Sequence, residues 1–214
     1  MAVHTSTVKI QSQSGATTYN SLLYHDDPAS SKLMIMLPGR GYTCEHPVLY
    51  YVRRMAVKSG YDVLSIEYGF QAAHLDLDAQ STPYLQDDVA QAVKQVMQPG
   101  YRHVCVVGKS LGTPLAAELA RTLDVEQAAL ILLTPIGGAL HGLGDIRTLA
   151  VIGTSDPLYS PEVVEAFRNN GSIEWRVFDG LNHSLEVNGD WKASIAALEH
   201  VISTCEMFLE KGTG

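Results

Sequence analysis

Residues 103–112, HVCVVGKSLG, join a short apolar run to the pentapeptide Gly-x-Ser-x-Gly, with Ser110 at its centre. A run of apolar and β-branched residues predicts a strand, and Gly108 and Gly112 allow the chain to turn sharply after it. The next segment, Leu111–Leu123, has the apolar periodicity of a helix. We therefore predict a strand, a tight turn and a helix, with the Ser110 hydroxyl exposed at the helix N-terminus.

Short apolar runs alternate with longer amphipathic segments on both sides of this stretch. The apolar runs are Lys32–Pro38, Asp62–Gly69, His103–Gly108, Ala128–Thr134, Thr148–Thr154 and the more mixed Glu174–Gly180. The segments with helical periodicity are Pro47–Lys58, Tyr84–Met97, Leu111–Leu123, Pro161–Asn169 and Asp190–Glu210. Continuous apolar runs are typical of strands buried on both faces of a parallel sheet, and repeated strand–helix alternation indicates crossover connections.

The N-terminal segments Thr5–Gln13 and Thr17–Tyr24 instead alternate apolar and polar residues, which predicts an antiparallel edge hairpin. No repeat, low-complexity tract or long linker divides the chain. We therefore predict the α/β class: a three-layer α/β/α sandwich, its sheet mostly parallel with an antiparallel N-terminal edge hairpin, in one domain over residues 1–214. The side chains assigned to core packing include Met34, Met36, Trp175 and Trp191.

Candidate functional residues follow the predicted strands, where open α/β sheets carry their chemistry. Ser110 follows the third apolar run, Asp156 the fifth and His183 the sixth. A serine hydroxyl needs a base to take its proton, imidazole titrates near neutral pH, and a carboxylate fixes the imidazole tautomer. These three roles are our leading interpretation. The alternatives are a helix N-cap for Ser110, a turn residue for Asp156 and a loop residue for His183, with Asp145, Asp179 and Glu186 as other candidate acids.

Two phosphate-binding motifs are incomplete in this chain. A P-loop needs a glycine five residues before Gly108, where His103 stands. A dinucleotide-binding motif beginning at Gly39 needs its third glycine where Cys44 stands. The sequence therefore disfavours nucleotide binding.

The segments Gly108–Gly112, Ser155–Pro157 and Asn182–Glu186 resemble those of the α/β-hydrolase family, in the family order serine, acid, histidine. The resemblance covers essentially the whole chain, and is to small, nearly lidless members such as dienelactone-hydrolase and carboxylesterase-like proteins. It implies a Ser110–His183–Asp156 catalytic triad. It also implies an oxyanion hole made by the backbone N–H groups of Leu111 and Arg40.

Two segments depart from the family pattern. Pro38-Gly39-Arg40 stands where relatives often carry His-Gly, and the Gly-rich stretch Pro135–Arg147 replaces a crossover helix or lid. With little lid, we expect an open site that favours small soluble substrates. The Arg40 side chain and Tyr42 are candidate substrate contacts: a guanidinium at this position is able to bind a carboxylate or phosphate, with a solvated arginine as the alternative.

The composition excludes several classes of partner. The chain has 214 residues with 15 Lys+Arg and 23 Asp+Glu, a formal net charge of −8, and this acidic balance argues against nucleic acid and anionic membranes. No apolar run approaches the roughly 20 residues of a membrane span. The three cysteines, Cys44, Cys105 and Cys205, share no metal-ligand spacing, so the sequence indicates neither a disulfide framework nor a zinc site. We expect no metal or organic cofactor, because the predicted serine chemistry requires none. The N-terminal segment lacks the apolar core of a secretory signal, and we expect a cytoplasmic protein.

The sequence as a whole predicts a serine hydrolase that cleaves a small carboxylic ester or related acyl compound through an acyl-enzyme. Its expected partner is a small-molecule acyl substrate, and a homo-oligomer is left open. One alternative is a non-catalytic ligand receptor or scaffold on the same fold. The other is acyltransferase or amidase chemistry with the same triad.

Overall fold

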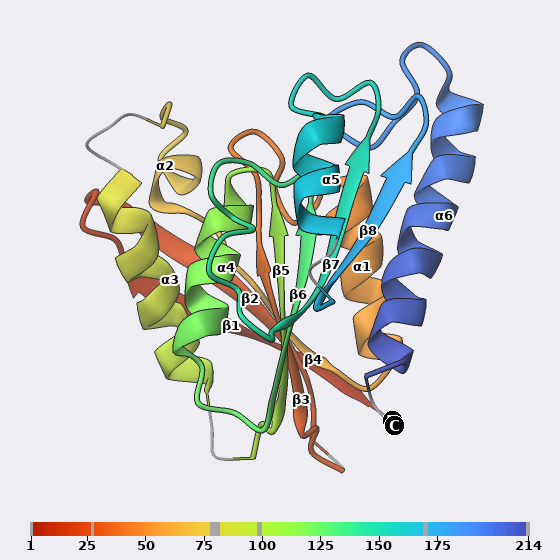
Figure 1. Ribbon diagram of the computed structural model, residues 1–214. Helices are drawn as coiled ribbons and strands as arrows, with labels where there is room; N and C mark the ends of the chain where they lie inside the picture. Colours follow the sequence, from red (N-terminus) through yellow and green to blue (C-terminus); the bar gives the residue numbers. More distant parts are fainter. Residues whose placement is uncertain (1, 27, 78–81, 98–99, 169–170, 213–214) are drawn as a thin grey trace.

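The computed structural model describes residues 2–26, 28–77, 82–97, 100–168 and 171–212 (Figure 1). The strands in these ranges are β1 (Val3–Gln11), β2 (Thr17–His25), β3 (Lys32–Leu37), β4 (Asp62–Ser65), β5 (His103–Lys109), β6 (Gln127–Leu133), β7 (Arg147–Gly153) and β8 (Ile173–Phe178). The helices are α1 (Pro47–Lys58), α2 (Gly69–Ala72), α3 (Thr82–Val96), α4 (Gly112–Thr122), α5 (Pro161–Arg168) and α6 (Trp191–Glu210).

The strands form one sheet in the order β1-β2-β4-β3-β5-β6-β7-β8. The six strands from β4 to β8 in this order are parallel, whereas β1 pairs antiparallel with β2, and β2 pairs antiparallel with β4. In register, Met34 of β3 lies opposite Val63 of β4 and Cys105 of β5. The predicted mostly parallel sheet with an antiparallel N-terminal edge hairpin is confirmed.

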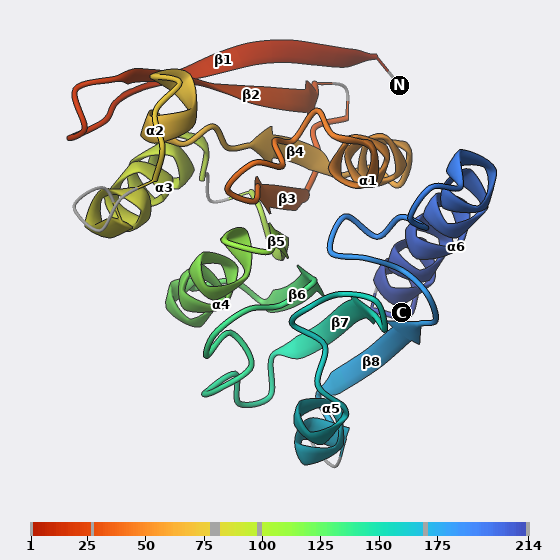
Figure 2. The same cartoon turned by 90° about the horizontal axis from the view of Figure 1, so that it is seen from above.

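Helices cover both faces of the sheet, with α1 and α6 on one side and α3, α4 and α5 on the other (Figure 2). Side chains alternate between faces along a strand. In β3, Leu33, Ile35 and Leu37 therefore pack in the cluster that includes α3 and α4. Met34 and Met36 point the other way, into the cluster with α1 and α6. This double burial explains the continuous apolar runs, and it confirms the three-layer α/β/α prediction.

Some boundaries differ from those predicted. The first strand spans Val3–Gln11 rather than Thr5–Gln13, because the chain turns at Ser12, whose N–H donates to Ala16 O, and Gly15 adopts a φ of 88°. The short helix α2 was not predicted. Asn169, the predicted last residue of α5, lies outside the described residues.

The assignment of Trp191 to the core was wrong. Trp191 is the first residue of α6 and is 68% exposed. Its neighbour Asp190 is the N-cap and accepts a hydrogen bond from the N–H of Ala193, so the helix begins at a turn that projects this side chain outward. Trp175, by contrast, is half-buried and packs against the cluster beside α3 and α4.

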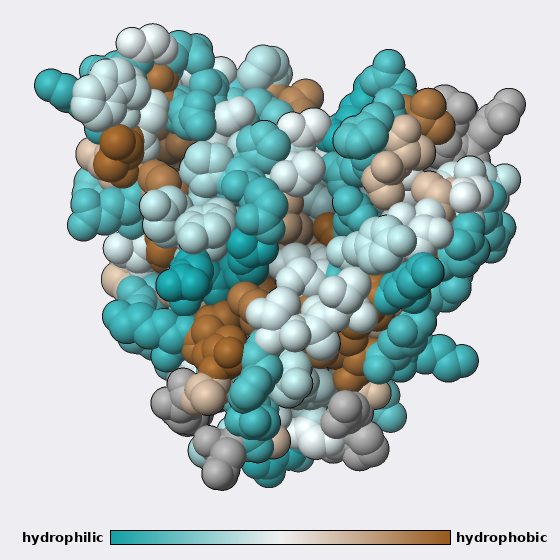
Figure 3. Space-filling model, turned by 180° about the vertical axis from the view of Figure 1, so that it is seen from behind, coloured by the Kyte–Doolittle hydropathy of each residue, from teal (hydrophilic) through white to brown (hydrophobic). Residues whose placement is uncertain are grey.

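The surface seen from behind in Figure 3 is mostly hydrophilic, with its apolar side chains in separate small patches. The same view shows a hollow between two lobes at the upper edge, where the parallel strands end. No helix in the described part of the chain is long and apolar enough to cross a membrane.

The Gly-rich stretch between β6 and β7 contains no helix or strand, although all of its residues are described. It turns at Gly137, Gly142 and Gly144, which have positive φ values of 55°, 67° and 57°. Leu140 and Leu143 are buried in the cluster beside α3 and α4, and the stretch runs next to α4 (Figure 1). The segment therefore packs down onto the core.

Candidate active site

The turn between β5 and α4 presents Ser110 with a φ of 51°, a conformation that L-residues rarely adopt. The Ser110 N–H donates to Leu133 O on the adjacent strand β6, which holds the turn in place. A Cβ added to Gly112 would collide with the backbone of Leu37, and one added to Gly108 would lie 2.8 Å from a backbone carbon of α4. The two glycines of the pentapeptide therefore allow the helix to pack directly against the strand ends.

Ser110, His183 and Asp156 form one continuous hydrogen-bonded chain. The Ser110 Oγ lies 2.8 Å from His183 Nε2, and His183 Nδ1 lies 2.7 Å from Asp156 Oδ2. The Asp156 side chain is fully buried, whereas that of His183 is 36% exposed. The structure thus brings together three side chains from the ends of β5, β7 and β8, separated by up to 73 positions in sequence.

Local hydrogen bonds shape the two loops that carry the acid and the imidazole. The second oxygen of Asp156, Oδ1, accepts from the N–H of Leu158 at 2.9 Å, so both carboxylate oxygens have donors. In the loop after β8, Asn182 Oδ1 accepts from the N–H groups of Ser184 and Glu186. This role of Asn182 was not predicted, although asparagine is a typical turn former and stands next to the loop histidine.

The loop after β3 lies directly against the serine. A Cβ on Gly39 would lie 3.5 Å from Ser110 Cβ and 3.4 Å from Lys109 O. The backbone N–H groups of Arg40 and Leu111, the two predicted oxyanion donors, have no hydrogen-bond partner among the described residues. Two free N–H groups close to a serine hydroxyl are able to bind a negatively charged oxygen.

The short helix α2 fixes the carbonyl side of this loop. Gln71 Nε2 donates to Gly39 O at 2.9 Å and to Arg40 O at 3.2 Å. The hydroxyl of Tyr68, just before α2, donates to Pro38 O at 3.1 Å. With these carbonyls bonded, the peptide planes of the loop are held in one orientation. Gln71 was not predictable from the sequence, because its contacts join segments about 30 residues apart.

Residues 30–210 match the family described as Alpha/beta hydrolase domain. The chain belongs to this family. The resemblance noted in the sequence is thereby confirmed. No curated protein matches the chain.

Several solved structures share the fold of this α/β-hydrolase. A dienelactone hydrolase from Anabaena variabilis is 16% identical, with a TM-score of 0.71 and 98% of each chain covered. A Xanthomonas campestris protein described as an α/β serine hydrolase without a lid is 15% identical, with a TM-score of 0.70 over 97% of this chain and 94% of that one. An esterase from Pyrococcus furiosus is 15% identical, with a TM-score of 0.67 over 100% of this chain and 92% of that one.

The two side chains predicted to touch substrate, Arg40 and Tyr42, both lie in the loop after β3. Arg40 is 59% exposed, and its guanidinium lies 3.4 Å from the carboxylate of Asp76, which is 98% exposed. Tyr42 is half-buried, and its hydroxyl accepts from the N–H of Val48 at the start of α1. Burial raises the pKa of Tyr42 to about 12, so this phenol stays protonated at neutral pH. Substrate contact by either residue stays a prediction.

Among the candidate acids, it is Asp156 that bonds to the imidazole. Asp179 instead accepts from Thr154 Oγ1 at 2.8 Å, while Asp145 and Glu186 are exposed. In the described ranges, no cluster of three or more His, Cys, Asp or Glu side chains is arranged to hold a metal ion.

Lys109 is a further residue of the site that the sequence analysis did not assign. It occupies the second position of the pentapeptide and is 1% exposed. Its ammonium donates to Thr134 Oγ1 at 2.7 Å and to the backbone oxygen of His183 at 2.6 Å. A lysine is seldom fully buried unless its charge is well paired. The Gly-x-Ser-x-Gly pattern allows any residue at this position, so it did not predict a role for Lys109.

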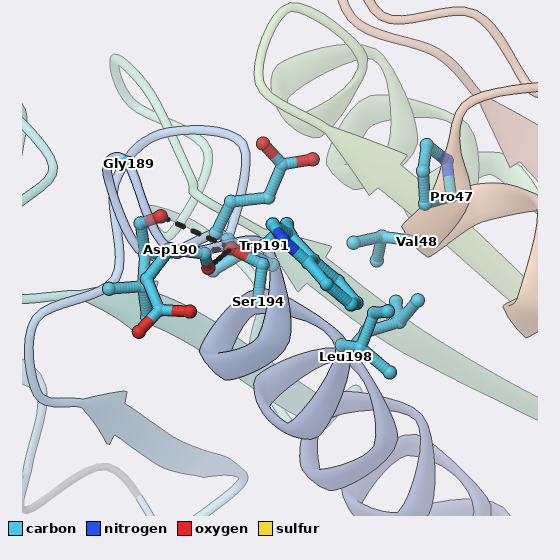
Figure 4. A pocket seen from close by; sticks show the side chains of 11 residues that line it. Pro47, Val48, Gly189, Asp190, Trp191, Ser194 and Leu198 are labelled. Atoms are coloured by element: carbon cyan, nitrogen blue, oxygen red, sulfur yellow. Dashed lines mark hydrogen bonds between the residues drawn. The ribbon is translucent and has the colours of Figure 1, made fainter.

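An apolar pocket of about 510 Å³ adjoins the loop that carries His183 (Figure 4). It lies between the starts of α1 and α6, and Figure 4 shows Trp191 facing Pro47 and Val48. Leu185 and Glu186, from the histidine loop itself, also line it. The exposed position of Trp191 therefore places an aromatic ring at the edge of this pocket.

Proposed function

We propose that this α/β-hydrolase is a serine hydrolase that cleaves a small carboxylic ester or a related acyl compound. The observation that carries the proposal is the hydrogen-bonded chain from Ser110 through His183 to Asp156. The names of similar folds, an esterase and a serine hydrolase among them, support the same class of chemistry.

In the proposed first half-reaction, Ser110 Oγ attacks the substrate carbonyl carbon while His183 Nε2 takes the serine proton. Asp156 holds the Nδ1–H of the imidazole and stabilises the imidazolium that forms. The backbone N–H groups of Arg40 and Leu111 donate to the oxygen that becomes negatively charged. The imidazolium then gives its proton to the departing alkoxide, which leaves as an alcohol.

In the second half-reaction, water attacks the acyl-serine and passes a proton to His183 Nε2. Collapse of the second tetrahedral intermediate breaks the bond to Ser110 Oγ, which recovers its proton from the imidazolium. The product is the free carboxylic acid. The hollow at the strand ends and the Gly-rich stretch packed against the core leave room for substrate to approach from solvent.

A fluorophosphonate probe tests this proposal, because it phosphonylates an activated serine with loss of fluoride. We expect the probe to label Ser110 in the wild-type protein, and p-nitrophenyl esters to be hydrolysed. Ser110→Ala and His183→Ala should each lower kcat by roughly 10³-fold or more with the fold retained. Ser203→Ala, on the exposed side of α6, is the control and should behave like wild type.

Labelling that persists in Ser110→Ala, or ester hydrolysis that is unchanged in it, would contradict the proposal. Absence of labelling in folded wild-type protein would instead favour a ligand receptor. Release of an acylated acceptor in place of free acid would favour a transferase.

A further inference from the structure

Lys109 is the buried charged group of the site that the steps above do not use. Three segments surround its ammonium: Thr134 Oγ1 at the end of β6, His183 O in the loop after β8, and the ring of Tyr42 in the loop after β3. Its nitrogen lies 5.0 Å from the centre of that ring, within the range of a cation–π contact. Both hydrogen bonds are short, as expected for a charged donor.

We propose that Lys109 is a positioning residue: its ammonium holds the backbone of His183 so that the imidazole faces Ser110. This inference rests on the proposed serine hydrolase function. Lys109 directly precedes Ser110 in the chain, so one side chain ties the base to the segment that carries the nucleophile.

The hydrogen bond from Lys109 links the loop around His183 to a distant element, whereas the other backbone hydrogen bonds of this loop are mainly local. The N–H of Asn182 donates to Glu186 O, and that of Leu185 donates to Asn182 O, within the loop itself. Leu185 adopts a φ of 63°, so the loop is also held in a strained conformation. Lys109 connects this loop to the central strand β5. A displacement of about 1 Å in a catalytic group costs up to roughly 10²-fold in rate.

The charge of Lys109 also affects its hydrogen bonds to Thr134 and His183. Burial lowers the pKa of Lys109 to about 8, while the nearby Asp156 carboxylate acts in the opposite direction. The titratable groups around the ammonium are Asp156, His183 and the neutral Tyr42, with Glu186 beyond Tyr42. Below about pH 8 Lys109 is therefore a cation, and its hydrogen bonds to Thr134 Oγ1 and His183 O are charge-assisted.

The direct test compares Lys109→Met with Lys94→Met, which removes an exposed lysine from α3. In Lys109→Met we expect fluorophosphonate labelling to slow by about tenfold or more, with kcat reduced and KM nearly unchanged. Backbone amides of residues 181–187 should exchange faster with deuterium. Lys94→Met should match wild type in labelling rate, kcat, KM and amide exchange.

Lys109→Arg and Thr134→Val complete the set. Lys109→Arg keeps the cation and should recover part of the labelling rate. Thr134→Val removes one acceptor of the Lys109 ammonium but leaves His183 O, so the labelling rate and amide exchange should change in the same direction by a smaller amount. If Lys109→Met does not fold, Thr134→Val provides the test. Wild-type labelling rates and wild-type amide exchange in the folded variants would overturn the proposal. If wild-type protein is not labelled at all, the serine hydrolase function fails. Amide exchange in residues 181–187 then still shows whether Lys109 holds the loop.

Discussion

The Asp156 side chain is buried and its carboxylate accepts two hydrogen bonds, whereas the imidazole of His183, its partner in one of them, reaches solvent. A charged acceptor fixes the proton of His183 on Nδ1 and leaves Nε2 free to take a proton from Ser110. Asp156→Asn keeps the shape and the bond from the Leu158 N–H, but an amide nitrogen is able to face Nδ1 and reverse the tautomer. We therefore expect kcat to fall by about 10⁴-fold.

Asp179→Asn provides the matched control, because Asp179 is a neighbouring carboxylate that accepts from Thr154 instead. Its ester hydrolysis should stay close to wild type, with both variants checked for an unchanged melting temperature. Equal losses in the two variants would mean that His183 does not depend on Asp156 in particular. A near-normal rate in Asp156→Asn would remove Asp156 from the triad.

At the scale of elements, the four-residue helix α2 holds the loop after β3 in place. It presents Gln71 to the carbonyls of Gly39 and Arg40, and the Gly39 carbonyl belongs to the same peptide group as the Arg40 N–H, one of the two proposed oxyanion donors. Gln71→Leu frees these peptide planes, and we expect kcat to fall by roughly tenfold or more while KM changes little. Gln91→Leu, on the exposed side of α3, is the control. A loss confined to KM would assign Gln71 to substrate binding rather than to the oxyanion loop.

The longer elements were predictable from sequence, and α2 was not, for a physical reason. Strands such as β3 are buried on both faces, so their apolar runs stand out, and α6 spans enough turns to show its period. A helix of four residues completes about one turn and has no period to detect. Its boundaries come from tertiary bonds such as Tyr68 to Pro38 O.

The site residues differ in the same way: a residue in a local sequence motif could be predicted, and residues defined by long-range contacts could not. Ser110 stands in a local motif whose glycines are required by close packing, so its turn could be predicted. Lys109 and Gln71 act through carbonyl groups that lie 74 and about 30 positions away, and any residue able to donate there would satisfy the bond. Trp191 followed a helical apolar pattern, yet the pattern does not tell which residue of the first turn faces solvent.

For the molecule as a whole, buried thiols on the α1 and α6 face contribute to how stability depends on alkaline pH. Cys44, Cys105 and Cys205 are free thiols buried in that face. Burial raises the pKa of each to about 12 from 9. The unfolded chain therefore releases these protons at lower pH than the folded chain does. Their contribution to stability is full below about pH 9 and is lost as the pH rises toward 12.

Cys205→Ala removes one of these thiols, which is 0% exposed and whose raised pKa has burial as its cause, together with its smaller effect on the pKa of Cys105. Between about pH 9 and 11 the wild-type free energy of unfolding should fall more steeply than that of the variant, by up to about 1.4 kcal/mol per pH unit. Lys109 titrates with the opposite sign between about pH 8 and 10.5, but it is present in both proteins and cancels. Urea unfolding at half-unit pH steps measures the two slopes, with the exposed Ser203→Ala as the control. Parallel curves for wild type and Cys205→Ala would show that this thiol is already accessible to solvent in the folded protein.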